Sequence, residues 1–89
     1  MKAIVTVIGK DSVGIIASVC SLLASYSINI LDISQTVMQG YFTMMMAVDT
    51  AGSAATFQEL ADSLNALGQQ SGLSIRIQRE DIFDAMHRV

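Results

Sequence analysis

The residues whose types could do chemistry gather in one short polar loop, GKDSVGI, at positions 9–15. The loop lies between an apolar run and a segment with helical spacing, so its backbone N–H groups would surround a helix N-terminus. Such groups favour anions, and Gly14 would let a ligand approach the backbone closely. Three functions are open for this loop: a phosphate cradle, a site for an anionic or zwitterionic small molecule, or a plain tight turn.

Residue types exclude two nucleotide-binding motifs. A Walker A loop requires Lys followed by Ser or Thr after its second glycine, whereas Ile15 and Ile16 follow Gly14. Lys10 precedes the helix and does not occupy the position of a phosphate-binding lysine. A dinucleotide fingerprint is excluded as well, because the chain contains no G-x-G. The small-molecule site and the tight turn remain.

The composition limits the fold and the partners. The chain has 89 residues, 52% hydrophobic and 15% charged, which predicts one folded domain that associates with another chain. The net charge of −3, without a basic block, argues against nucleic-acid binding. The single Cys20 excludes an intramolecular disulfide, and no run has the length of a signal or membrane segment. We therefore predict a cytoplasmic protein with neither nucleic-acid nor membrane partners.

The elements that must position the loop follow from the hydrophobic periodicity. Strands are predicted at 2–8, 29–38, 41–49 and 73–79, with a hairpin turn at Gln39-Gly40. With a helix after the first strand and another after the third, the order is that of a ferredoxin-like βαββαβ sandwich. This α+β fold has a four-stranded antiparallel sheet with two helices on one face. It would occupy residues 1–79.

Each predicted helix has an apolar stripe and candidate end signals. The first is expected from Val13, capped by Asp11 or Ser12. The second begins at Ser53 or at a Thr56-x-x-Glu59 box, and ends at Gly72. The first stripe is Val13, Ile16, Ala17, Cys20, Leu23 and Ala24, and the second is Phe57, Leu60, Ala61, Leu64, Leu67 and Gly68.

Strand parity predicts which residues meet the helices. In the third strand Phe42, Met44, Met46 and Val48 should point inward, and in the second strand Leu31, Ile33 and Val37 should do so. The opposite sheet face then carries several apolar residues of the first and third strands, which something must cover.

The last ten residues, 80–89, supply a candidate cover. They predict a short helical tail with an apolar stripe and charges that suit a helix dipole. A helix this short is unstable alone, so its stripe must dock, and we favour docking on a partner subunit. The interface residues would be Ile82, Phe83 and Met86.

Catalytic and metal sites are not predicted. The sequence has no carboxylate pair at fixed spacing and no nucleophile with a base. The first loop has no phosphate-binding arginine. We therefore do not expect an enzyme. His87 has no second His or Cys to complete a metal site, and no cofactor is implied. The RNA-binding version of this sandwich needs aromatic residues on the first strand, which has none.

The stretch IVTVIGKDSVGIIASVCSLLASYSINILDIS resembles the first half of an ACT domain, a ferredoxin-like regulatory module that often binds amino acids. The similarity covers residues 2–79. Within the family it is closest to small stand-alone proteins that end in QREDIFDAMHR, as residues 78–88 do, and the first half is similar to the glycine-cleavage repressor type.

The resemblance implies a site and a function. The family's effector loop and the asparagine that faces it from a neighbouring strand or subunit fall on Gly9, Lys10, Asp11, Ser12, Val13, Gly14, Ile15 and Asn29. Strong amino-acid binders of the family have His and Asn where this chain has Gly9 and Asp11. We therefore expect a homodimeric regulatory domain with an amino-acid effector. The alternative is a protein-interaction module that regulates a protein partner without a metabolite.

Overall fold

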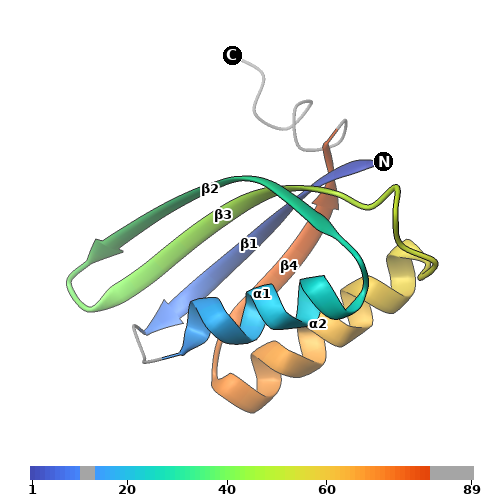
Figure 1. Ribbon diagram of the computed structural model, residues 1–89. Coiled ribbons are helices and arrows are strands. Elements are labelled where there is room, and N and C mark those ends of the chain that lie inside the picture. The colour runs from blue at the N-terminus through green and yellow to red at the C-terminus, as the bar shows by residue number, and fades with distance from the viewer. Residues whose placement is uncertain (11–13, 81–89) are drawn as a thin grey trace.

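The computed structural model describes residues 1–10 and 14–80 (Figure 1). The predicted tail residues Ile82, Phe83 and Met86 lie outside this part of the chain, as do Asp11, Ser12 and Val13. The elements are β1 (Lys2–Lys10), α1 (Ile15–Ser25), β2 (Asn29–Met38), β3 (Tyr41–Asp49), α2 (Phe57–Ser71) and β4 (Ser74–Arg79).

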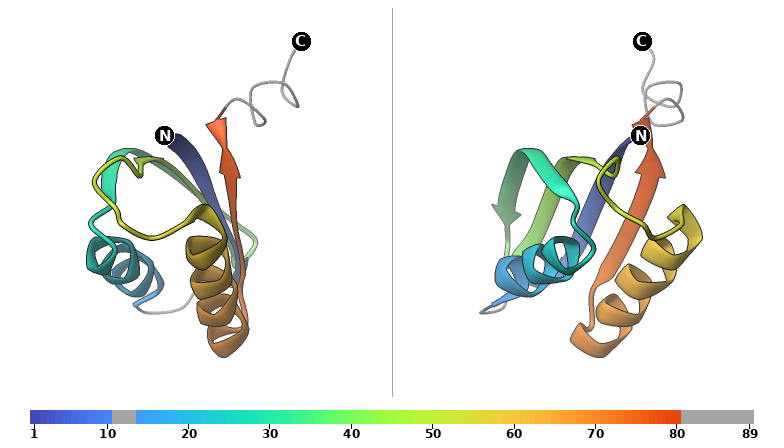
Figure 2. Two further views of the ribbon diagram at one scale, coloured as in Figure 1. Left: turned by 90° about the vertical axis from the view of Figure 1, so that its right-hand side faces the viewer. Right: turned by 45° about the vertical axis from the view of Figure 1, so that its right-hand side comes forward.

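The four strands form one antiparallel sheet in the order β2-β3-β1-β4, so β2 and β4 are its edges. Both helices lie on the same side of the sheet (Figure 2). We call the other side the open face. This arrangement confirms the predicted ferredoxin-like sandwich.

The turn and the second helix have the predicted ends. Gln39 and Gly40 both adopt positive φ, 52° and 82°, as a two-residue hairpin turn of type I′ requires. Of the two possible starts of α2, the structure has the capping box, in which the Glu59 N–H donates to the Thr56 hydroxyl and the Thr56 N–H to the Glu59 carboxylate. Gly72 caps the other end in a left-handed conformation.

The core lies between the sheet and the helices. The alternation predicted for β3 is confirmed, because its four inward residues are all buried. The second-helix stripe is confirmed as well, with Leu60, Leu64 and Gly68 buried. The buried apolar residues are Ala3, Val5, Val7, Ile15, Val19, Leu23, Ile28, Phe42, Met44, Met46, Val48, Leu60, Leu64, Ile75 and Ile77.

The first helix differs from its prediction. It begins at Ile15, two residues after Val13, and its N-cap is Gly14. Its buried residues are Ile15, Val19 and Leu23, whereas Ile16, Ala17 and Ala24 of the predicted stripe are exposed. The segment IIASVCSLLA is apolar almost all round, so two stripes fit the helical period and packing against the sheet decides between them.

The second strand also differs. Leu31, Ile33 and Val37 were expected to meet the helices, but they are 46%, 43% and 57% exposed. Ile33 and Val37 do share a face with the inward Met46 and Phe42, with which they pair, yet β2 is an edge strand and that part of it remains uncovered. Leu31 lies in a β-bulge, where the register with β3 shifts between Ile30 and Asp32.

Candidate functional site

The predicted loop joins the end of β1 to the start of α1 (Figure 1). Gly9 and Lys10 are the last two residues of β1, and Lys10 is exposed. Gly14 and Ile15 begin α1, with Ile15 buried in the core. The structure thus holds both sides of the loop in place at one end of the sheet.

Gly9 has a packing role. A Cβ at this position would collide with the Leu73 side chain and would lie 3.4 Å from the Leu73 Cα. Leu73 in turn donates its N–H to the carbonyl oxygen of Gly68 at 2.8 Å, at the end of α2. The first glycine of the loop is therefore accounted for by contact between β1 and the residue that precedes β4.

Gly14 has a conformational role, and it leaves the N-terminus of α1 open. Its φ of 87° is in the left-handed region that favours glycine. As the N-cap it has no side chain to accept a hydrogen bond, and the first turn of α1 contains no acidic residue. The N-terminus of α2, by contrast, is closed by Thr56 and Glu59. Of these two helix starts, only that of α2 has a side-chain cap among the described residues.

Asn29 does not lie beside the loop within one chain. It begins β2 opposite Asp49, at one end of β3, whereas Lys10 pairs with Tyr41 at the other end. From Tyr41 to Asp49, β3 advances by eight residues, which is about 26 Å at about 3.3 Å per residue. A site that contains both Asn29 and the loop would require two chains.

The outer edge of β2 carries a group of exposed apolar side chains that the sequence did not indicate. Every residue from Leu31 to Gly40 is exposed, and Met38 reaches 69%. Pro, Lys and Arg, which often protect edge strands from pairing, do not occur in β2. We call this group the β2 edge surface, and its members are Leu31, Ile33, Val37 and Met38.

A charged pair lies at the Asn29 end of the sheet. The N-terminal ammonium of Met1 is 3.6 Å from Asp49 Oδ1. The Ala51 N–H donates to the same oxygen at 3.0 Å. That backbone hydrogen bond, followed by the nearby ammonium, lowers the pKa of Asp49 below its ordinary value.

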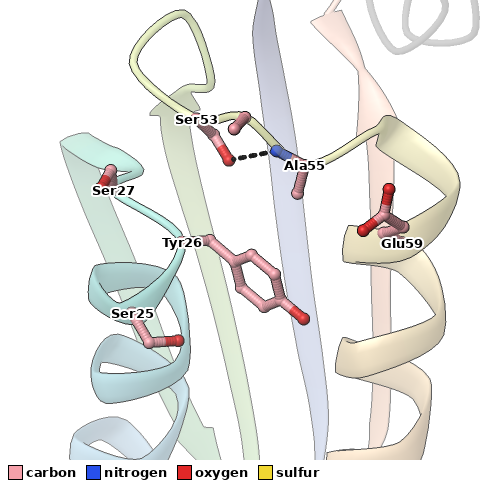
Figure 3. A pocket seen from close by; sticks show the side chains of 7 residues that line it. Ser25, Tyr26, Ser27, Ser53, Ala55 and Glu59 are labelled. Carbon is pink, nitrogen blue, oxygen red and sulfur yellow. Dashed lines mark hydrogen bonds between the residues drawn. The ribbon is translucent and has the colours of Figure 1, made fainter.

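A hollow of about 340 Å³ lies between the C-terminal end of α1 and the N-terminal end of α2. We call it the interhelical hollow. Figure 3 shows the Tyr26 ring between the two helices, the end of α1 on one side, and Ser53 with Ala55 above. It was not predicted, because its parts are far apart in sequence and form no motif. It is lined by Ser25, Tyr26, Ser27, Ser53, Ala54, Ala55 and Glu59.

The described residues contain neither a membrane-spanning helix nor a metal-binding cluster. In residues 1–10 and 14–80, no helix has the length and apolar character needed to cross a membrane. The same part of the chain contains no group of three or more His, Cys, Asp or Glu residues arranged to hold a metal ion.

Comparison with known proteins gives a consistent family. The ACT domain family matches residues 2–78. A UPF0237 protein of Clostridium acetobutylicum is 57% identical over 89 residues, which cover 100% of both chains. The solved structure of an ACT domain protein from Streptococcus pneumoniae has a TM-score of 0.83 and 46% identity, covering 98% of each chain.

A crystal structure assigned as a glycine cleavage system transcriptional repressor has a TM-score of 0.76 and 27% identity, covering 86% of this chain and 44% of that one. The resemblance of the first half to this type is thereby confirmed. ACT domains are regulatory, ligand-binding domains of amino-acid-related proteins. The fold, the match over nearly the whole chain and the full-length relatives together place this chain in the ACT domain family.

Proposed function

We propose that this chain is a non-enzymatic regulatory domain that forms a homodimer and binds an amino acid at the loop between β1 and α1. The observation that carries the proposal is the difference between the two helix starts. Thr56 and Glu59 cap the N-terminus of α2, whereas no side chain of the described residues caps α1, which starts at Gly14. The N–H groups and the positive dipole end of α1 suit the carboxylate of an amino acid.

The β2 edge surface supports the dimer. An edge strand with unpaired backbone groups and exposed aliphatic side chains can pair with the same strand of a second copy. If the two-fold axis passes through Gln35, Ile33 lies opposite Val37 of the partner subunit, so that aliphatic side chains meet on the helix side of the sheet. Such a pair would join two sheets into one with eight strands.

This pairing would also bring Asn29 of the partner subunit toward the loop, from which Asn29 is distant within one chain. Because the two β2 strands run antiparallel, the start of the partner's strand lies beside the end of the first one. The partner's Asn29 then reaches the end of the sheet that carries Lys10, Gly14 and Ile15. Each of the two sites would combine the loop of one chain with Asn29 of the partner subunit.

Titration calorimetry with the twenty amino acids tests the ligand. We expect one or a few to bind the parent protein, with an affinity that differs by about tenfold in Asp11→Asn, because this change removes a negative charge near the bound zwitterion. In an ¹⁵N NMR titration the amides of Gly14 to Ala17 should shift. Absence of binding to both proteins would contradict the amino-acid function.

Cysteine cross-linking tests the dimer. In a Cys20→Ala background, Gln35→Cys should form an intersubunit disulfide, because a residue on the two-fold axis faces its own copy at about 5 Å between Cα atoms. Gln70→Cys, exposed on α2, is the matched control and should remain uncross-linked. Equal cross-linking of both variants would show random collision instead of β2 pairing.

The alternative function, a protein-interaction module without a metabolite, is favoured by the same β2 edge surface. An extended segment of a different protein could add to this edge as a fifth strand. Sedimentation distinguishes the two: a dimer that Ile33→Lys converts to a monomer supports self-pairing, while a parent protein that is monomeric at micromolar concentration leaves the edge for another partner. Ala66→Lys is the control, because Ala66 is also exposed but lies on α2, away from β2.

A further inference from the structure

We propose that the interhelical hollow is a second ligand site, which binds the ammonium group of a small hydroxylated amine. The hollow lies at the C-terminal end of α1, whereas the loop of the proposed amino-acid site lies at its N-terminal end. The two sites are therefore separate, and either can fail without the other.

The charges around the hollow favour a cation. Backbone carbonyls at the end of α1 give it the negative end of a helix dipole, and the last turn contains no basic residue to offset it. Glu59 adds a carboxylate from the first turn of α2. The lining contains no Lys, Arg or His.

An anion is disfavoured even though a helix N-terminus is nearby. The Thr56 N–H donates to Glu59 Oε1 at 3.3 Å, and the Glu59 N–H donates to the Thr56 hydroxyl at 3.1 Å. The capping box thus occupies two of the donors at this helix start, and it places the negative Glu59 carboxylate beside them, which repels a carboxylate or phosphate. Glu59 Oε2 has no partner among the described residues, so it remains available to accept from an ammonium group.

The aromatic ring of Tyr26 is fixed in place inside the hollow. Figure 3 shows the ring in the space between the two helices. Its hydroxyl oxygen lies 2.6 Å from Ser63 Oγ on α2, and this hydrogen bond holds the ring there. The face of a tyrosine ring attracts ammonium groups. A carboxylate and an aromatic ring both line the hollow, and both kinds of group bind primary amines.

Two serines could bind a hydroxyl group of the same ligand. Ser25 Oγ donates its proton to the Leu22 carbonyl at 2.6 Å, so it can accept from the ligand. Ser53 Oγ accepts from the Ala55 N–H at 3.2 Å, so it can donate. Ser25 thus offers an acceptor and Ser53 a donor, and a ligand hydroxyl can bind to either one.

The test is an ¹⁵N NMR titration with ethanolamine, with ethylene glycol as its neutral analogue. We expect saturable shifts of the Ser27, Ser53, Ala55 and Glu59 amides with ethanolamine, with a dissociation constant in the millimolar range because the probe has few atoms. Ethylene glycol should bind about tenfold more weakly, since it lacks the charge. Shifts of the Gly14 to Ala17 amides would instead report the proposed amino-acid site.

Glu59→Gln is the decisive variant, because glutamine keeps the capping box while it removes the charge. It should weaken ethanolamine binding about tenfold without a change in folding. Asp62→Asn removes a charge from the next turn of α2, outside the hollow, and should leave binding unchanged. Equal binding of ethanolamine and ethylene glycol, no saturable shift, or an unaffected Glu59→Gln variant would each overturn the proposal.

Discussion

Tyr26 and Ser63 join the two helices by a hydrogen bond of 2.6 Å between their hydroxyl oxygens, although 37 residues separate them in sequence. The bond is partly buried and links the C-cap of α1 to the second turn of α2. Since the described part of the chain has no other side-chain hydrogen bond between the helices, this pair fixes their relative position at that end.

The first prediction is that this bond stabilises the fold by about 1 kcal/mol. Tyr26→Phe, Ser63→Ala and the double variant form a cycle whose coupling energy isolates the pair, because the higher helix propensity of alanine cancels between the two Ser63 steps. Urea denaturation measures the free energies of unfolding. Strictly additive single variants would mean that the two hydroxyls are bound to water in solution.

The second prediction concerns Gly68, where a normally stabilising change should destabilise. Gly→Ala inside a helix ordinarily gains up to about 1 kcal/mol. Here a Cβ would lie 2.7 Å from the backbone carbonyl oxygen of Leu73, which cannot move without disturbing the connection to β4.

We therefore expect Gly68→Ala to cost about 1–3 kcal/mol of unfolding free energy. Asn65→Ala, at an exposed position of the same helix, is the control and should gain a few tenths of a kcal/mol. A stabilised Gly68→Ala variant would mean that α2 can move away from the end of the sheet at little cost.

The third prediction concerns acid stability. The Ala51 N–H and the N-terminal ammonium both favour the charged form of Asp49, so its pKa is lower in the folded than in the unfolded state. The resulting stabilisation is present above the unfolded-state pKa of about 3.9 and is lost as pH falls through the folded-state pKa.

Asp49→Asn should therefore lose stability less steeply than the parent protein on acidification below about pH 5. An ¹³C NMR titration of the Asp49 carboxyl measures the shift directly. Acetylation of the N-terminus should raise this pKa part of the way, since it removes the ammonium charge but leaves the Ala51 hydrogen bond. If acetylation leaves the titration of Asp49 unchanged, the backbone hydrogen bond from Ala51 alone lowers its pKa.

The fold could be predicted almost completely because local signals agreed with one another. The strands Asn29–Met38 and Tyr41–Asp49 have their predicted bounds, since Gln39-Gly40 fixes the hairpin. The failures occurred where local signals were ambiguous. The helix at Ile15–Ser25 offered two apolar stripes, and nothing in the sequence marks the bulge at Leu31 or the edge position of its strand.

The two candidate sites were predictable to different extents. The loop was found because Gly14 and Gly9 punctuate the sequence, although Gly9 serves packing against Leu73. The interhelical hollow was missed because Tyr26 and Glu59 line one space only when the helices pack side by side. A segment rich in hydroxyl groups, such as Ser25-Tyr26-Ser27, does not indicate a binding site until the residues that face it in the fold are known.

The fourth prediction concerns the tail, residues 80–89. The open face presents Ile4 and Met45 on the two central strands, and both are only partly buried within the chain. We expect the apolar stripe of Ile82, Phe83 and Met86 to dock on a partner subunit, so Phe83→Ala should weaken stability or association by about 3 kcal/mol.

Deletion of residues 80–89 should have a larger effect, because it removes the whole stripe. His87→Ala serves as the matched control, since His87 is not among the predicted interface residues of the tail. Melting temperature and sedimentation at several protein concentrations separate lost stability from lost association, because only association makes the melting temperature depend on concentration. A truncated chain with the parent's melting temperature and oligomeric state would establish that the tail is a solvated extension.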